Sequence, residues 1–277
     1  MDPLTLPARS WLFVPATRPE RFAKAAASGA DRVILDLEDS VAPPEKREAA
    51  RALPGASLPA NVPVYLRVNA HGTEWFEDDL AVAARLRIAG IVLPKAEAGE
   101  HAARAAAALP SAHRIVPIVE TAVGLWNALD VARAPRVERL AFGAIDLELD
   151  TGMRDEGDSM VYARSRVVIA SRVAGIAPPI DSVTLGIDDE AAVGRDAERG
   201  RRLGFAGKLC IHPRQIGPTN RVFQPSDAEV EWAGSLLAAV AARPRDAAAF
   251  SFRGTMVDRP VIERARQILA QAGKARG

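Results

Sequence analysis

The chain has 277 residues, of which 48% are hydrophobic and 26% are charged, and its formal net charge is +1. This composition is typical of a globular protein with one large domain or two small ones, and the near-zero charge gives no reason to expect nucleic acid or a membrane surface as a partner. No apolar run approaches the ~20 residues of a membrane span, no signal peptide opens the chain, and the single cysteine, Cys210, excludes an intramolecular disulfide, so we expect a cytoplasmic protein.

Short apolar runs rich in β-branched residues recur along most of the chain, separated by helix-forming segments rich in Ala, Arg and Glu. The expected strands are 11–16, 32–39, 62–69, 90–96, 114–121, 139–147, 178–185 and 207–213. Strands that alternate with helices are usually parallel, and eight such units in ~200–250 residues predict a (β/α)8 TIM barrel. A doubly wound open sheet is the alternative, weakened because no G-x-G-x-x-G motif follows the first strand.

The C-terminal part has a different pattern. Ser226 is well placed to cap a helix, and residues 259–273 form a second amphipathic pattern. Between these helices, residues 243–257 show little periodicity and contain Gly and Arg, which suits a lid. The expected organisation is a catalytic barrel domain over 1–225 and a C-terminal helical extension or lid over 226–277.

The second expected strand ends in a cluster of acids. Because side chains alternate between the barrel interior and the helix layer, Asp36 and Glu38 should face the interior, with Asp39 just past the strand end. Carboxylates so close together repel one another unless they are solvated or bind a positive group.

Polar side chains close other strands as well: Arg67 the third, Glu120 the fifth and Asp146 the sixth. The carboxyl ends of barrel strands meet at one face, where barrel enzymes place their active sites. Mg²⁺ prefers one or two protein carboxylates and leaves its other positions to water and substrate oxygens. We therefore expect Glu120 and Asp146 to bind Mg²⁺ directly, the acids of the second strand to bind metal-bound waters, and Arg67 to bind a substrate carboxylate.

Each of these residues also has a purely structural interpretation. A single acid is more often solvated or a helix cap, and Arg67 alone could be an ion-pair partner inside the barrel. Lys95 is a weak site candidate, and His212 is more often a hydrogen-bonded turn residue than a catalyst. Neither a Ser/His/Asp nor a Cys/His pattern supports nucleophilic catalysis. The joint pattern at four strand ends favours the functional interpretation.

Seven motifs occur in order along the chain: RSWLFVPATRPERFAKA, VILDLEDSV, LRVN, LPK, VPIVETAVGL, AFGAIDL and GKLCIHPRQI. Together they resemble the citrate lyase β-subunit-like members of the HpcH/HpaI aldolase superfamily, from about Arg9 to Ala270. The resemblance implies a Mg²⁺-dependent barrel enzyme, usually a homotrimer, that cleaves or forms carbon–carbon bonds in 3-hydroxyacyl thioesters.

The resemblance also implies roles for individual residues inside the barrel. Glu120 and Asp146 match the metal ligands, and Arg67 and Glu120 match the substrate-binding residues. Three further residues match positions that hold coenzyme A in the malyl-CoA lyase branch, namely Phe13, Arg18 and Lys24. From the residues alone, Arg18 and Lys24 would only form a cationic edge of the first helix.

Asp258, in the motif GTMVDRP, has two interpretations. From the residues alone it is the N-cap of the last helix, because Pro260 follows shortly after it. By resemblance to the CoA-dependent lyases, it reaches the active site of a neighbouring subunit and transfers a proton, which makes Arg67 and Asp258 the expected catalytic residues.

The expected reaction is cleavage of a 3-hydroxy-3-carboxyacyl-CoA, such as citramalyl- or malyl-CoA, into acetyl-CoA or a homologue and a 2-oxo acid. The expected partners are therefore an acyl-CoA thioester and a 2-oxo acid, with Mg²⁺ as cofactor. One alternative is a malate-synthase-like thioesterase activity. Another is an acyl-carrier-protein-dependent subunit of the citrate lyase β type in a larger complex, although the complete set of Arg67, Glu120 and Asp146 argues against a catalytically weak subunit.

Overall fold

The computed structural model describes residues 8–243 and 250–276. Over these residues the chain divides into two compact units, Ala8–Phe223 and a second unit that begins at Gln224. No helix in these described ranges is long and apolar enough to cross a membrane.

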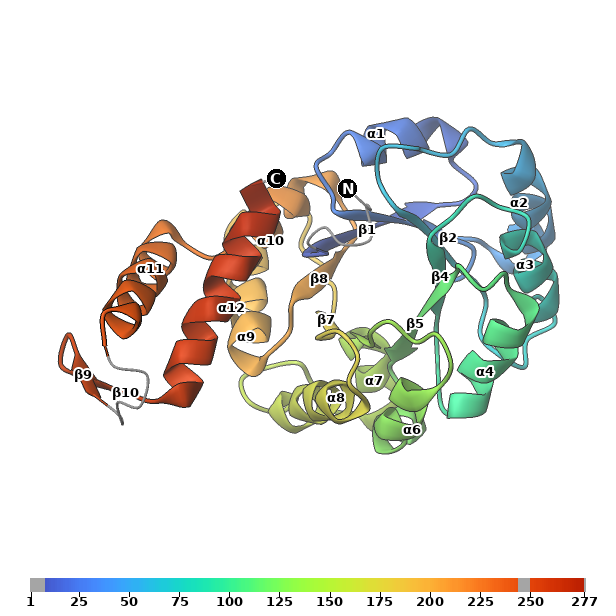
Figure 1. The fold of residues 1–277 in the computed structure, drawn as a ribbon. Helices are drawn as coiled ribbons and strands as arrows, with labels where there is room; N and C mark the ends of the chain where they lie inside the picture. The colour runs from blue at the N-terminus through green and yellow to red at the C-terminus, as the bar shows by residue number, and fades with distance from the viewer. Residues whose placement is uncertain (1–7, 244–249, 277) are drawn as a thin grey trace. The chain divides into compact units, whose positions relative to one another are not determined.

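Eight parallel strands of the first unit close into a barrel, each strand pairing with the next in the sequence and β1 pairing with β8 (Figure 1). They are β1 Ser10–Pro15, β2 Arg32–Asp36, β3 Val64–Arg67, β4 Gly90–Leu93, β5 Arg114–Val119, β6 Ala141–Phe142, β7 Ile180–Asp181 and β8 Gly207–Cys210. The predicted (β/α)8 barrel is confirmed and the open sheet is excluded. Every expected strand overlaps an observed one, but β6 and β7 contain only two residues each.

Helices of the same unit surround the strands (Figure 1). They are α1 Phe22–Ala26, α2 Lys46–Ala52, α3 Phe76–Ala83, α4 Gly99–Ala108, α5 Ala122–Trp126, α6 Ala128–Arg133, α7 Ala144–Thr151, α8 Val161–Ala174, α9 Glu190–Leu203 and α10 Ile216–Phe223. Short 3-10 turns lie at Pro19–Arg21, Pro43–Glu45, Leu53–Gly55 and Pro213–Gln215. The Ala- and Arg-rich spacers favour helix because these residues have high intrinsic helix propensity.

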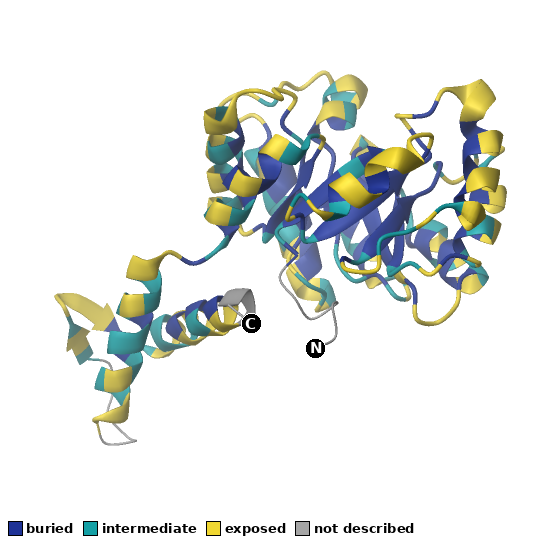
Figure 2. Cartoon of the chain, turned by 90° about the horizontal axis from the view of Figure 1, so that it is seen from above, coloured by how far each residue is buried: buried dark blue, intermediate teal, exposed yellow. Residues whose placement is uncertain are grey.

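The strands alternate between two apolar layers, and the barrel is buried on both faces (Figure 2). Leu35 packs outward against the helices, whereas Ile34 and Tyr65 pack inside the barrel, as the alternation predicted. Burying an aliphatic side chain of this size contributes about 1.5–3 kcal/mol, which fixes the register of each strand. In that register Asp36 pairs with Arg67, so the last residues of β2 and β3 are neighbours at the C-terminal mouth.

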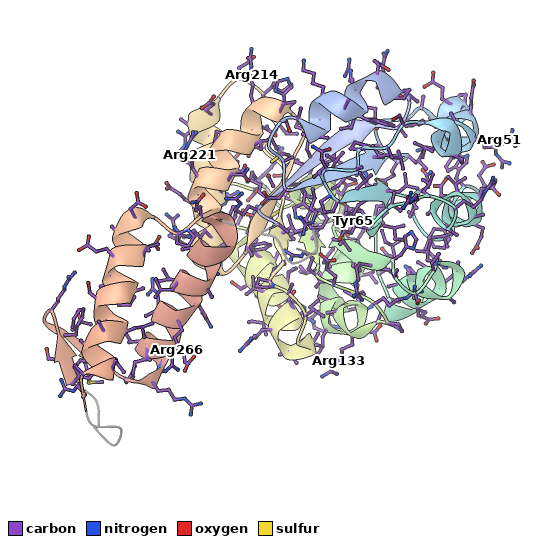
Figure 3. The ribbon with its side chains drawn as sticks, turned by 45° about the horizontal axis from the view of Figure 1, so that its top comes forward. Arg51, Tyr65, Arg133, Arg214, Arg221 and Arg266 are labelled. Atoms are coloured by element: carbon purple, nitrogen blue, oxygen red, sulfur yellow. The ribbon has the colours of Figure 1, made fainter. Side chains whose placement is uncertain are left out.

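The interior is filled rather than hollow below this mouth. Tyr65 lies in the middle of the barrel, whereas the labelled arginines Arg51, Arg133, Arg214 and Arg221 lie at its periphery (Figure 3). The ring of Tyr65 packs against that of Trp11, with centroids 4.8 Å apart, and its hydroxyl donates to Glu138 Oε2 at 2.9 Å. The middle of the barrel is therefore occupied by packed side chains.

The second unit contains α11 Asp227–Ala241, a hairpin of β9 Phe250–Phe252 and β10 Thr255–Val257, and α12 Arg259–Arg276. Ser226 caps α11 through a reciprocal bond pair with Glu229, as predicted. The hairpin was not predicted. Residues 244–249 of the expected lid lie outside the described residues, and the lid over 243–257 stays a prediction. The turn of the hairpin uses Arg253 and Gly254, which both have positive φ (49° and 81°), as a two-residue turn of type I′ requires.

Candidate active site at the C-terminal mouth of the barrel

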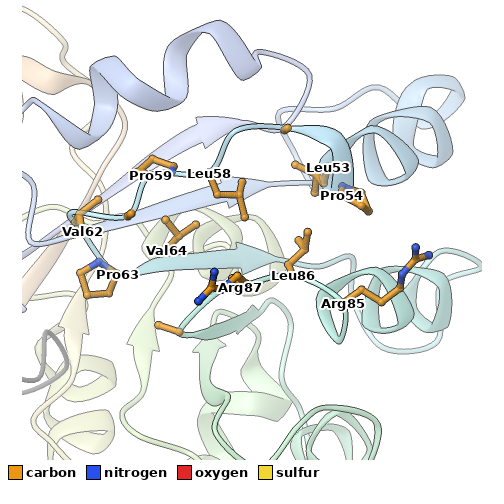
Figure 4. A pocket seen from close by; sticks show the side chains of 13 residues that line it. Leu53, Pro54, Leu58, Pro59, Val62, Pro63, Val64, Arg85, Leu86 and Arg87 are labelled. Atoms are coloured by element: carbon orange, nitrogen blue, oxygen red, sulfur yellow. The ribbon is translucent and has the colours of Figure 1, made fainter.

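Two cavities lie at opposite ends of the strands. The larger, about 700 Å³, lies where β3 and β4 begin and is lined by Leu53, Val64, Arg85 and Arg87, among others (Figure 4). No carboxylate is among its described lining residues. The smaller cavity, about 380 Å³, lies at the carboxyl ends of the strands, where barrel enzymes carry out their chemistry. The smaller cavity is therefore the candidate active site.

The lining of this cavity is of two kinds. Charged side chains expected from the strand ends line it, namely Asp36, Asp39, Arg67, Glu120 and Asp146. Aliphatic side chains from α7 and from the later strands and their loops also line it, including Ile145, Val183, Leu185, Leu209 and Ile211. A ligand held here would contact both ionic and apolar groups.

Arg67 is the centre of an ionic cluster on β2 and β3. Its Nε donates to Asp36 Oδ1 at 2.6 Å and its Nη2 to Asp36 Oδ2 at 2.7 Å, a two-pronged pair. Its Nη1 donates to Asp39 Oδ2 at 3.1 Å and lies 2.9 Å from Glu38 Oε2. The adjacent Phe13 ring lies under the guanidinium, 4.6 Å from centroid to Cζ. The acids of the second strand thus bind a positive side chain directly.

The balance between burial and the charge of Arg67 differs at Asp36 and Glu38. Burial raises the pKa of Asp36, but the charge and hydrogen bonds of Arg67 outweigh it and hold that pKa below its ordinary value. Burial also raises the pKa of Glu38, and there it outweighs the attraction of Arg67, so the pKa stays above its ordinary value. Asp36 is therefore harder to protonate than an ordinary aspartate, whereas Glu38 is easier to protonate than an ordinary glutamate. That Asp36, Glu38 and Asp39 bind metal-bound waters stays a prediction.

Lys95, which follows β4 and ranked low in the sequence analysis, touches three acids of the site. Its backbone N–H donates to Glu120 Oε1 at 2.8 Å. Its ammonium donates to Glu38 Oε1 at 2.6 Å and lies 3.4 Å from Asp146 Oδ1. Burial lowers the pKa of Lys95, but Glu38, Glu120 and Asp146 together raise it above its ordinary value, so the side chain is charged.

Glu120 and Asp146, the expected metal ligands, reach the cavity from different elements. Glu120 directly follows β5 and is 3% exposed. Burial, together with the negative charges of Asp146 and Glu38, raises the pKa of Glu120 to about 8. Asp146 was expected to close the sixth strand, but β6 ends at Phe142 and Asp146 lies in the first turn of α7.

Gly143, the N-cap of α7, makes this arrangement possible. A Cβ at position 143 would lie 2.4 Å from Glu120 Oε2 and 2.6 Å from Glu120 Cβ, far inside contact distance. The start of α7 is fixed from the other side, since Ala144 N donates to Ser182 Oγ at 2.9 Å. Without a side chain at position 143, the Glu120 carboxylate fits against the start of the helix that carries Asp146.

The charge balance of the site fits a divalent cation. Five acidic side chains meet two cations, Arg67 and Lys95. Even with Glu120 protonated and the buried ammonium of Lys46 counted, which donates to the backbone carbonyls of Leu37 and Glu38, the acids are in excess. Over the described part of the chain, no three His, Cys, Asp or Glu side chains enclose a metal position by themselves. A pair of carboxylates, Glu120 and Asp146, would leave several positions to water and substrate, as Mg²⁺ prefers.

The remaining predicted site residues are only partly brought together. Phe13 lines the cavity, whereas Arg18 and Lys24 are exposed on the first turn and helix after β1 and do not line it. Asp258 belongs to the second unit, where Val261 N donates to its Oδ1 at 3.3 Å, consistent with an N-cap of α12. His212 Nδ1 accepts from Arg214 N at 3.3 Å, which confirms its interpretation as a turn residue.

The chain is similar to known proteins over nearly its whole length. Residues 9–213 match the family described as HpcH/HpaI aldolase/citrate lyase. The chain is 40% identical to a citrate lyase subunit beta-like protein of Deinococcus radiodurans, covering 95% of this chain and 96% of that protein. It is 34% identical to a (3S)-malyl-CoA thioesterase of Cereibacter sphaeroides, covering 96% and 95%. The crystal structure of the CitE protein of Mycobacterium tuberculosis with magnesium, acetoacetate and coenzyme A superposes with a TM-score of 0.85 and 36% identity, covering 96% of this chain and 98% of that one.

Proposed function

The chain belongs to the HpcH/HpaI aldolase/citrate lyase family, and we propose that it is a Mg²⁺-dependent carbon–carbon lyase. Its substrate would be a 3-hydroxy-3-carboxyacyl-CoA of the citramalyl-CoA or malyl-CoA type, split into acetyl-CoA or a homologue and a 2-oxo acid. The observation that carries this proposal is the cavity at the C-terminal mouth, which Arg67, Glu120 and Asp146 all line. A related CitE structure that contains magnesium, acetoacetate and coenzyme A supports this choice of ligands.

The charged residues that line the cavity would have separate roles. Glu120 and Asp146 would hold the metal, which when bound would act as a Lewis acid toward the oxygens of the 2-oxo acid half. Arg67 would bind the substrate carboxylate. Asp39 is the partner that this carboxylate would displace, because the Asp39 side chain is 60% exposed whereas that of Asp36 is 2% exposed.

Cleavage breaks an O–H bond and a C–C bond and forms a C=O bond and a C–H bond, so that one proton leaves the hydroxyl and one is returned to the acyl carbon. The substrate hydroxyl loses its proton and becomes the carbonyl of the 2-oxo acid. The neighbouring carbon–carbon bond breaks, and its electron pair goes to the thioester enolate. Protonation of that enolate gives acetyl-CoA or its homologue. We assign this last proton transfer to Asp258 of a neighbouring subunit, on the resemblance to the CoA-dependent lyases.

A homotrimer is therefore part of the proposal. Large apolar side chains are exposed on α5, α7 and α8, including Trp126 at 71%, Leu149 at 87% and Tyr162 at 63%. Exposed apolar side chains in such numbers are typical of protein–protein contacts. We further place the protein in the cytoplasm, where its single cysteine would remain a thiol.

Coenzyme A would lie along the edge formed by β1 and α1. Phe13 is in the wall of the cavity, and the exposed cations Arg18 and Lys24 follow it along the chain. Exposed cations at the rim suit the phosphates of coenzyme A, while the thioester end would reach the cavity. Charge-neutral replacement of Arg18 and Lys24 should therefore raise KM for the thioester and leave kcat little changed.

Thioester hydrolysis is the second candidate function. The observation in its favour is the 34% identity to the (3S)-malyl-CoA thioesterase of Cereibacter sphaeroides over nearly the whole chain. An acyl-carrier-protein-dependent subunit is a third possibility, since the citrate lyase subunit beta of Leuconostoc mesenteroides is 31% identical. The cavity geometry is compatible with all three thioester reactions, so the products decide among them.

The experiment that tests the proposal is a substrate panel. Purified protein would be incubated with a series of 3-hydroxyacyl-CoAs, with Mg²⁺ or with a chelator, and the 2-oxo acid would be measured directly. We expect a 2-oxo acid from at least one thioester, only when Mg²⁺ is present. Formation of a 2-oxo acid from none of them would refute the lyase assignment.

A further inference from the structure

Lys95 has an unusual backbone for its residue type. Its φ is +48°, one of three positive values among the described residues other than glycine. An unbranched L-residue adopts this conformation only when its surroundings hold it there, and such residues cluster at functional sites. At this position the conformation aims the backbone N–H at Glu120 and sends the side chain across the mouth to Glu38 and Asp146.

The ammonium of Lys95 does not hold its two acids equally. Its nitrogen is 2.6 Å from Glu38 Oε1, a strong charge-assisted hydrogen bond, and 3.4 Å from Asp146 Oδ1, an ion pair without that bond. Among the described residues the structure shows one cation within ion-pair distance of Asp146, and that is Lys95. The weaker of the two contacts is therefore the one to a proposed metal ligand.

We propose that Lys95 is the internal counter-cation of this carboxylate cluster and a positioning residue for the two metal ligands. In the cation-free protein the ammonium of Lys95 neutralises Asp146. When a divalent cation binds, the ammonium loses its contact with Asp146 and retains its hydrogen bond to Glu38. Its backbone N–H holds Glu120 Oε1 throughout. This inference rests on the proposed magnesium site, because it assigns to Lys95 the charge that the metal replaces.

The consequence is competition between two cations for one carboxylate. A positive charge near a divalent ion weakens its binding, even where water screens the pair. Removal of the ammonium should therefore tighten Mg²⁺ binding, although it deletes a contact of the site. If Lys95 had only a structural role, its loss would have the opposite effect, because a less ordered site would bind Mg²⁺ more weakly.

The test is Mg²⁺ titration by calorimetry of the full-length protein and matched variants. Lys95→Met and Lys95→Gln remove the charge but keep an unbranched side chain and the backbone N–H, whereas Lys95→Arg keeps the charge. Arg47→Met is the control, since it removes an exposed cation that pairs with Glu74 on the barrel periphery. We expect the two neutral variants to bind Mg²⁺ roughly tenfold more tightly than wild type, and Lys95→Arg and the Arg47→Met control to match wild type.

Two outcomes would overturn the inference, and they are distinguishable. Equal or weaker Mg²⁺ affinity in both neutral variants, with clear binding to wild type, would refute the role of Lys95 and leave the proposed function intact. Absence of Mg²⁺ binding to wild type would refute the magnesium site itself, and the inference with it. Thermal unfolding of each variant, with and without Mg²⁺, supplies a second readout, because tighter binding gives a larger stabilisation by the ion.

Discussion

Arg67 and Asp36 occupy paired positions on neighbouring strands, and the guanidinium of Arg67 binds both carboxylate oxygens of Asp36, at 2.6 and 2.7 Å. Both side chains are nearly inaccessible to water, with 10% and 2% of their surface exposed. The pair holds Arg67 in place without any ligand, so that in the proposed reaction only its exposed partner Asp39 would have to move to admit a substrate carboxylate.

This geometry predicts that Arg67→Lys is not a conservative change. Lysine keeps the charge but cannot bind Asp36 with two parallel bonds, and loss of a charged hydrogen bond costs about 1.5–3 kcal/mol. We expect the free energy of unfolding to fall by that amount and kcat/KM to fall at least about tenfold. Arg47→Lys is the control, with a change within ~0.5 kcal/mol because its ion pair is exposed. Wild-type kinetics in Arg67→Lys would return Arg67 to a structural role.

Gly143→Ala should damage the metal site without removing a ligand. The new Cβ would overlap the Glu120 carboxylate, so we expect Mg²⁺ affinity to fall about 10–100-fold and the protein to lose about 1–3 kcal/mol of stability. The matched control is Gly234→Ala in α11, which meets no atom within 4 Å and should leave Mg²⁺ binding unchanged. Unchanged Mg²⁺ affinity in Gly143→Ala would show that Glu120 is not a ligand.

Mg²⁺ binding should release a proton near neutral pH. The pKa of Glu120 is raised to about 8 in the cation-free protein, so its carboxyl is mostly protonated at pH 7 and must lose the proton to bind metal. We expect release of about one proton per Mg²⁺ at pH 7, and an affinity that rises with pH and levels off above pH 8. Calorimetry in buffers of different ionisation enthalpy measures the release. No proton release at pH 7 would contradict the position of Glu120 beside Asp146 and Glu38.

Asp258→Ser separates the two roles of Asp258. Serine caps helices as well as aspartate does but has no carboxylate, so the free energy of unfolding should stay within ~0.5 kcal/mol of wild type while turnover falls. Asp258→Ala is the comparison and should lose about 1 kcal/mol as well, because it lacks the capping oxygen seen at Val261. Full turnover in Asp258→Ser would leave the residue a cap.

The neighbouring-subunit assignment has its own test. Asp146→Ala and Asp258→Ser would each be inactive, and mixing them under conditions of subunit exchange should restore part of the activity if Asp258 serves another subunit's barrel. No recovery after demonstrated exchange would argue that each site is complete within one chain.

The fold could be predicted from sequence patterns because side-chain alternation and the spacing of strands and helices are local properties of the chain. Alternation placed Leu35 against the helices and Tyr65 in the interior, and β–α spacing gave the barrel. The same patterns were less reliable where one residue decides the outcome. The sixth strand was expected to reach residue 147, but the N-cap at Gly143 starts a helix there and moves Asp146 off the strand.

The partners of the acids could not be predicted in the same way. Which cation meets Asp36 or Glu38 depends on strand order and on side-chain length across the mouth, and these are tertiary properties. The motif LPK does not predict the left-handed backbone conformation that brings Lys95 into the cluster. In contrast, the hairpin over 250–257 had a signal in the sequence that was missed, the dipeptide Arg253–Gly254 between two short segments that contain apolar residues.

The most direct test of the account is the product stoichiometry of one reaction. Wild-type protein with Mg²⁺ and its best 3-hydroxy-3-carboxyacyl-CoA would be sampled over time, and the shorter acyl-CoA, the 2-oxo acid and free CoA would each be quantified, with Asp146→Ala as the matched control. We predict equal amounts of the shorter acyl-CoA and the 2-oxo acid, little free CoA, and no products from Asp146→Ala. Free CoA together with the intact hydroxy acid, or equal turnover in Asp146→Ala, would contradict a Mg²⁺-dependent carbon–carbon lyase.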